Sequence, residues 1–115
     1  MEIHVKEDRG MHIVEIHWNL GISTMKQFKE KMASLIESGA GNIILSFEHT
    51  KYIDSSGISA LISFSTRLKK EGIGFRFANI KGSVAHVFEI THLDQFFPIS
   101  KTVEDARKEL EDHPA

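Results

Sequence analysis

Two serines stand beside an aspartate and a glycine at one point of the chain, Asp54-Ser55-Ser56-Gly57, directly before an amphipathic segment. A serine hydroxyl that is exposed on a rigid loop can accept a phosphoryl group. The N–H groups and dipole at a helix N-terminus would stabilise that phosphate, which carries about −1.5 to −2 charges at neutral pH. The same side chains also suit helix capping, because their oxygens accept hydrogen bonds from unpaired N–H groups of a first helical turn. The tetrapeptide by itself leaves both interpretations open.

A serine hydrolase is a third interpretation of this region, with Ser55 or Ser59 as the nucleophile. The nucleophile-elbow pattern requires Gly-x-Ser-x-Gly, but in the run that starts at Gly57 the place of the second glycine is taken by Leu61. We therefore expect a protein that is not an enzyme.

Seven histidines in a chain of 115 residues raise the question of a metal site. They show no His-x-x-x-His or similar ligand spacing. We expect histidines scattered over the surface, with no metal and no other cofactor. The seven are His4, His12, His17, His49, His86, His92 and His113.

A pair of strands is predicted at the start of the chain. Apolar and polar residues alternate from Ile3 to Val5, and after the turn residues 8–10 a second alternation places Val14, Ile16 and Trp18 on one face. We expect two strands joined by a tight turn.

A helix and a buried strand follow. Apolar residues recur at helical spacing over residues 25–36, Thr24 and Gln27 form a candidate capping box, and Gly39 is a candidate C-terminal stop. Residues 43–47 form a short apolar run, which is typical of a strand covered on both faces and so central in a sheet.

Helices and strands alternate through the rest of the chain. The apolar stripe that follows Asp54-Ser55-Ser56-Gly57, which we call the serine loop, ends at Glu71-Gly72. The aromatic pairs Phe75/Phe77 and Phe96/Phe97 are assigned to the core. The alternation predicts an α/β fold, a mixed sheet with helices packed on it. The expected elements are a helix from 58 to 68, a strand near 75–78, a short helix over 84–90, a strand over 97–100 and a final helix over 103–110.

The serine loop and the segments around it closely resemble the STAS-domain anti-sigma factor antagonists, also called anti-anti-sigma factors. The resemblance is centred on Tyr52-Ile53-Asp54-Ser55-Ser56-Gly57-Ile58 and extends in order and spacing from Gly41 to Leu110. It implies one STAS domain over residues 1–115, with a mixed sheet of about five strands, mostly parallel, covered by about four helices. The matching segments outside the loop are 42–47, 60–62, 74–79, 84–93, 96–99 and 102–106.

The resemblance also implies a function. Such an antagonist binds a serine-kinase anti-sigma factor and thereby releases a sigma factor to activate transcription. The kinase phosphorylates the serine directly after the loop aspartate, and a serine phosphatase reverses the modification. Carried over to this chain, the phosphoacceptor is Ser55, with Ser56 as the alternative, and the partner-binding residues are Asp54, Ser55, Ser56, Gly57 and Ile58. Asp54 would orient the loop and polarise the Ser55 hydroxyl, and Gly57 would let the kinase approach the backbone closely.

One segment departs from the family pattern. The loop after the second strand usually reads like Gly-Glu-Leu-Asp and lies near the phosphorylation loop, whereas residues 18–23 here are Trp-Asn-Leu-Gly-Ile-Ser. The change at Asn19-Leu20-Gly21 bears on the choice of partner rather than on the fold. The alternative function is a STAS scaffold or small-ligand domain, binding a nucleotide or a lipid in a signalling or transport complex.

Composition excludes several other classes of protein. Fourteen Lys and Arg against sixteen Asp and Glu leave a formal charge of −2, so we expect no direct nucleic-acid binding. The absence of cysteine excludes disulfides and thiolate zinc sites. No apolar run is long enough to span a membrane and no secretory signal is visible, so we expect a cytoplasmic protein, monomeric when free.

Overall fold

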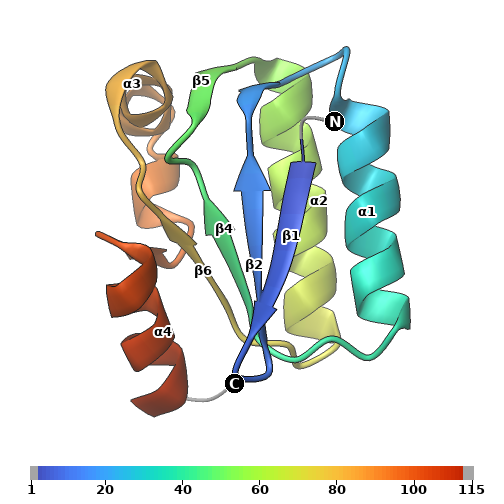
Figure 1. Cartoon of the computed structure of the whole chain (residues 1–115). Helices are drawn as coiled ribbons and strands as arrows, with labels where there is room; N and C mark the ends of the chain where they lie inside the picture. The colour runs from blue at the N-terminus through green and yellow to red at the C-terminus, as the bar shows by residue number, and fades with distance from the viewer. Residues whose placement is uncertain (1–2, 113–115) are drawn as a thin grey trace.

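The computed structural model describes residues 3–112, which form a five-stranded sheet with four helices packed on it (Figure 1). β1 runs antiparallel to β2, and the β2–β4, β4–β6 and β6–β7 pairs are parallel. The expected fold class, a mixed and mostly parallel sheet of five strands, is confirmed. In spatial order the strands are β1 (Ile3–Asp8), β2 (Met11–Ile16), β4 (Ile43–Ser46), β6 (Phe75–Ala78) and β7 (Ile99–Ser100).

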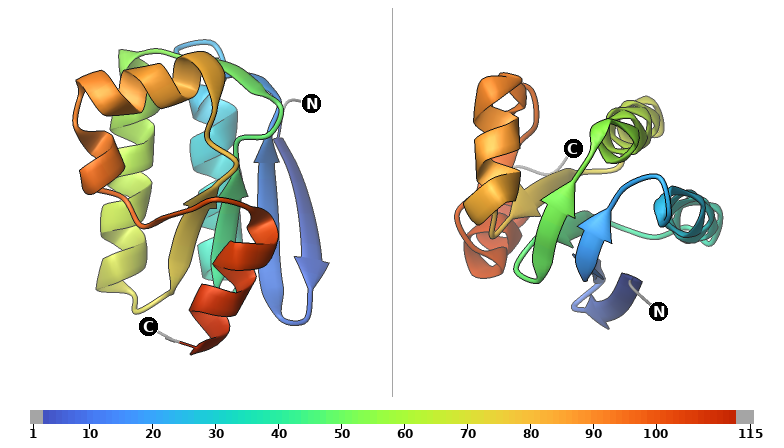
Figure 2. Two further views of the ribbon diagram at one scale, coloured as in Figure 1. Left: turned by 90° about the vertical axis from the view of Figure 1, so that its left-hand side faces the viewer. Right: turned by 90° about the horizontal axis from the view of Figure 1, so that it is seen from above.

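Helices cover both faces of the sheet (Figure 2). Buried side chains of α1 (Met25–Glu37) and α2 (Ser55–Lys70) join the larger apolar cluster on one face, together with those of α3 (Gly82–Ile90). α4 (Val103–Asp112) covers the other face, where Ala106 and Leu110 pack in a smaller cluster. A single 3-10 turn, η1 (Leu93–Gln95), follows α3.

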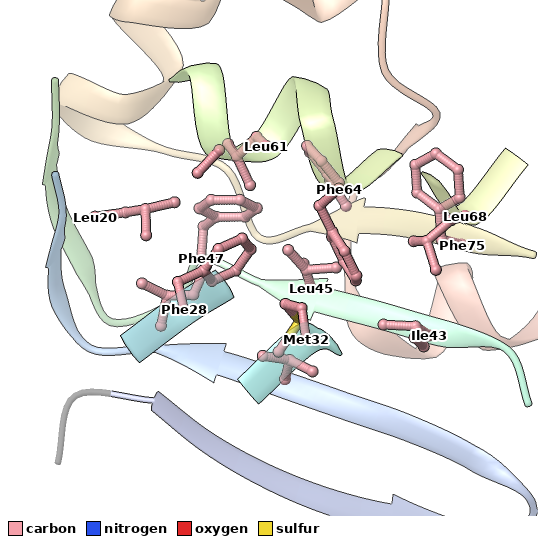
Figure 3. Packing of buried hydrophobic residues seen from close by; sticks show 14 of the residues in the cluster. Leu20, Phe28, Met32, Ile43, Leu45, Phe47, Leu61, Phe64, Leu68 and Phe75 are labelled. Atoms are coloured by element: carbon pink, nitrogen blue, oxygen red, sulfur yellow. The ribbon is translucent and has the colours of Figure 1, made fainter. Parts of the chain in front are cut away.

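The central strand β4 explains why the sheet needs both layers of helices. All four of its residues are buried, and Ile43 and Leu45 face the larger cluster while Ile44 faces the smaller one. In Figure 3, side chains from α1 and α2 point toward those of β4 and Phe75. The expectation of a central strand covered on both faces is therefore confirmed.

Left-handed residues make the turns that the sequence predicted. The β1–β2 turn has Arg9 at φ 54° and Gly10 at φ 81°, the positive values that a two-residue hairpin needs. Gly39 and Gly72 have φ values of 81° and 72° just beyond the ends of α1 and α2, where a residue with no Cβ can reverse the chain without strain. The predicted helix ends are confirmed.

A two-stranded ribbon stands at one end of the sheet and was not predicted. It pairs β3 (Trp18–Leu20) in parallel with β5 (Thr50–Ile53). The expectation that Trp18 lies on one face of the second strand with Val14 and Ile16 is wrong, because β2 ends at Ile16 and the backbone turns at Trp18 with φ 70°. The alternation of faces is broken there, and the Trp18 side chain is exposed.

Two further local expectations are corrected. The Thr24 side chain makes no capping bond to the first turn of α1; its hydroxyl instead accepts a hydrogen bond from Gly21 N–H at 3.0 Å, in the preceding loop. The Phe96/Phe97 pair is split: Phe97 is buried, whereas Phe96 is about half exposed and lies under the Lys69 ammonium.

Candidate functional site

Asp54 is the fixed point of the serine loop. It is the N-cap of α2, and its carboxylate accepts a hydrogen bond from Gly57 N–H at 3.0 Å through Oδ1 and one from Ile22 N–H at 3.1 Å through Oδ2. These backbone donors, Gly57 first and then Ile22, hold the pKa of Asp54 below its ordinary value. Asp54 thus ties the start of α2 to the loop after β3.

Ser55 is the first residue of α2, and its side chain is exposed. Ser56 and Ile58 are partly buried. Both carboxylate oxygens of Asp54 are engaged with backbone N–H groups, and within residues 3–112 the Ser55 hydroxyl makes no hydrogen bond. Asp54 therefore orients the loop as expected, but in this structure it does not polarise the Ser55 hydroxyl.

Gly57 is buried, and the reason for a glycine lies inside the molecule. A Cβ added at this position would collide with the carbonyl oxygen of Leu20 and would lie 3.0 Å from the Ile53 side chain. The close approach is made by the protein's own β3 strand. The packing beneath the loop therefore requires a glycine here, and the expected role of Gly57 in admitting a kinase to the backbone stays a prediction.

We expect Gly57→Ala to destabilise the fold. Forcing a methyl group against the Leu20 backbone costs about 1–3 kcal/mol, which exceeds the gain of at most about 1 kcal/mol in helix propensity. Urea unfolding measures the difference, with the exposed Ser63→Ala on the same helix as the matched control. Wild-type stability in Gly57→Ala would contradict the contact.

Residues 18–23, the segment that departs from the family pattern, lie directly against the serine loop. The Asp54 N–H donates to the Leu20 carbonyl at 3.3 Å, and a Cβ at Gly21 would collide with the Asp54 carboxylate. The Thr24 hydroxyl contacts Gly21 N–H and the Asn19 carbonyl, at 3.0 and 3.2 Å, so the loop is held from both sides. The expected proximity of this loop to Asp54–Gly57 is confirmed.

Asp54 predicts a pH dependence of stability. Because its pKa is lowered in the folded protein, the carboxylate contributes stability above the unfolded pKa of about 3.9, and this contribution is lost as the pH falls through the lower folded pKa. The Asp54→Asn variant keeps one side-chain oxygen that accepts from Gly57 N–H, but it places an NH2 group against Ile22 N–H, and two donors cannot bond each other. We expect its thermal midpoint to lie a few degrees below wild type at pH 7, with the gap closing below about pH 4. A gap that stays constant from pH 7 to pH 3 would contradict this prediction.

Three large apolar side chains are exposed in the segments that pair with or follow one another beside Asp54, and two of them, Ile22 and Tyr52, line the same hollow as Asp54. Trp18, Ile22 and Tyr52 are 64%, 77% and 69% exposed. They come from the β3–β5 ribbon and the loop after β3, and we call them the ribbon patch. A hollow of about 230 Å³ lies beside it, lined by residues 19–23 and 52–54. Sequence patterns did not identify this patch, since an isolated Ile or Tyr carries no signal of exposure.

Three of the histidines lie together, so the expectation that all are scattered is wrong. The ring of His17 lies between those of His4 and His49, with centroid separations of 4.2 and 4.7 Å. His86 and His92 are exposed elsewhere on the surface, and His113 is outside the described residues. Strand pairing rather than sequence spacing brings the three together.

No helix in the described part of the chain is both long enough and apolar enough to cross a membrane.

The chain matches the model of the STAS domain family over residues 2–106. It therefore belongs to the STAS domain family. The Bordetella bronchiseptica protein BtrV, which is named for a role as an anti-sigma factor antagonist, is 22% identical over 106 residues, 92% of this chain and 91% of its own. These matches confirm the family resemblance seen in the sequence.

Solved structures share the fold. The crystal structure of an anti-sigma factor antagonist from Mycobacterium paratuberculosis superposes with a TM-score of 0.85 at 20% identity, covering 96% of this chain and 93% of that one. The Bacillus cell fate determinant SpoIIAA, in its phosphorylated form, superposes with a TM-score of 0.71 at 21% identity, covering 94% and 98%. At these identities the similarity shows the fold.

Proposed function

We propose that this protein is a non-enzymatic anti-sigma factor antagonist whose Ser55 is phosphorylated by its own partner, a serine-kinase anti-sigma factor. The observation that carries the proposal is the Ser55 hydroxyl itself. It is exposed at the first residue of α2 and makes no hydrogen bond within the described residues, on a loop that Asp54 ties to Gly57 N–H and to Ile22 N–H. Ser56, the alternative acceptor, is less accessible.

The ribbon patch supports a protein partner. Exposed large apolar side chains that cluster next to a polar loop are a common mark of an interaction surface. Ile22 and Tyr52 add exposed apolar area beside Asp54, Trp18 extends it along the ribbon, and aromatic side chains are enriched where proteins bind each other. A kinase that docks on this patch would bring its nucleotide to Ser55. The unbound sigma factor would then activate transcription.

Phosphorylation would act as a switch at this surface. The γ-phosphoryl group of ATP is transferred to Ser55 Oγ, ADP leaves, and the hydroxyl proton passes to a base on the kinase. The product places about −1.5 to −2 charges beside the ionised Asp54, which opposes binding to a nucleotide-bearing partner. The α2 N-terminus tolerates the phosphate, so the fold should persist. A serine phosphatase would restore binding.

Phosphate mapping tests the proposal. The protein is incubated with a serine-kinase anti-sigma factor and ATP, and peptides are mapped by mass spectrometry for wild type, Ser55→Ala and Ser56→Ala. We expect near-complete loss of phosphate in Ser55→Ala only. If an active kinase phosphorylates none of the three, Asp54–Gly57 serves as a helix cap and the alternative function, a STAS scaffold or ligand-binding domain, is favoured.

A further inference from the structure

A carboxylate and two imidazoles converge at the end of β2, away from the serine loop. Glu15 is near the end of that strand, His17 follows it, and His49 comes from the segment between β4 and β5. One ligand atom from each lies within 4.8 Å of the other two, and Glu15 Oε1 is 3.3 Å from His17 Nε2. Within residues 3–112 no other group of histidine and acidic side chains has this arrangement.

The topology of the sheet produces this cluster. β2 and β4 are parallel, so the residues that follow them emerge at the same edge, and the Trp18 N–H bonds the His49 carbonyl at 2.9 Å. Residues 17 and 49 therefore become neighbours although no sequence motif connects them. Odd-numbered β2 residues face the side of the sheet that α4 covers, but Glu15 lies beyond the apolar cluster under α4 and is only partly buried.

We propose that Glu15, His17 and His49 form a binding site for a divalent transition metal ion, with zinc as the best fit. Two imidazoles and a carboxylate are donors that suit zinc and cobalt, and three protein ligands leave a further coordination position open. Bonds of about 2.0–2.2 Å place zinc ligand atoms closer together than 4.8 Å, so the side chains must move inward. His49 is exposed and His17 partly so, which leaves them room to rotate.

The neighbouring side chains set the conditions for binding. Lys6 forms an ion pair with Glu15 at 3.6 Å, and a metal ion would displace its ammonium group from that carboxylate. His4 lies opposite Glu15 in the β1–β2 pairing and packs against the His17 ring. A bound ion would link the start of β3 to the segment before β5, at the base of the ribbon that carries the ribbon patch.

Metal titration of the untagged protein tests the site. Isothermal titration with zinc chloride measures the affinity, and the visible absorption of added cobalt reports the coordination geometry. We expect one ion per chain, a rise in melting temperature with zinc that EDTA reverses, and at least tenfold weaker binding in His17→Ala and in His49→Ala. His86→Ala, which removes an exposed histidine from α3, is the matched control and should bind as wild type does.

Two results would overturn the site. One is the absence of saturable binding by the wild-type chain. The other is equal affinity in wild type, His17→Ala, His49→Ala and His86→Ala, which would indicate nonspecific surface binding. Circular dichroism on each variant shows that it is folded, and Glu15→Gln, which changes only a side-chain oxygen, should also weaken binding. None of these measurements depends on Ser55 or on a kinase.

Discussion

Ser55→Asp should weaken binding to the proposed partner, a serine-kinase anti-sigma factor, by about a hundredfold, which corresponds to roughly 2.8 kcal/mol. The added carboxylate would stand next to the ionised Asp54, which shares a hollow with the exposed Ile22 and Tyr52, and a partner docked there would exclude water. Placing like charges together at an interface costs several kcal/mol. Calorimetry or surface plasmon resonance with the nucleotide-bound kinase measures the effect. Ser55→Ala adds no charge and should bind nearly as wild type does.

The control for this prediction is Ser63→Asp. It adds the same charge to an exposed position two turns further along α2. Equal losses in Ser55→Asp and Ser63→Asp would mean that net charge rather than position decides binding. Wild-type affinity in Ser55→Asp would place the interface elsewhere. The fold should survive the substitution, because a negative charge is favourable in the first turn of a helix.

Phe77→Ala should have the largest effect on stability, a loss of about 3–5 kcal/mol. The ring is fully buried in β6, with centroid distances of 4.5 Å to Phe97 and 5.4 Å to Phe47. Its removal leaves a cavity where strand β6, α3 and the segment before β7 meet. Small domains have a total stability of about 5–15 kcal/mol, so a large share would be lost. Denaturant unfolding followed by circular dichroism gives the value.

Phe96→Ala is the matched control for this core prediction. Phe96 is about half exposed and retains contacts with Phe97 and Lys69, so its loss should cost about 1 kcal/mol or less. If both variants lost the same free energy, the assignment of Phe77 to the centre of the core and of Phe96 to its border would be wrong.

Local patterns in the sequence were sufficient for most of the fold and for the position of the candidate site. Helix periodicity and the glycines at 39 and 72 marked α1 and α2, and the apolar run of β4 marked the middle of the sheet. These signals work because each depends on a single segment that must bury one face or both. The serine loop was identifiable for the same reason, since its residues are contiguous.

Contacts between distant segments could be recognised only once the chain was folded. Trp18 continues an alternating pattern in sequence, yet a left-handed residue turns it out to solvent, and β3 then pairs with β5. The bond from Ile22 N–H to Asp54 and the approach of Leu20 to Gly57 join segments more than 30 residues apart. The spacing of residues along the chain does not predict these two contacts. They form only because β2 and β4 lie parallel, so that the segments that follow the two strands meet at the same end of the sheet. The grouping of His17 with His49 has the same origin.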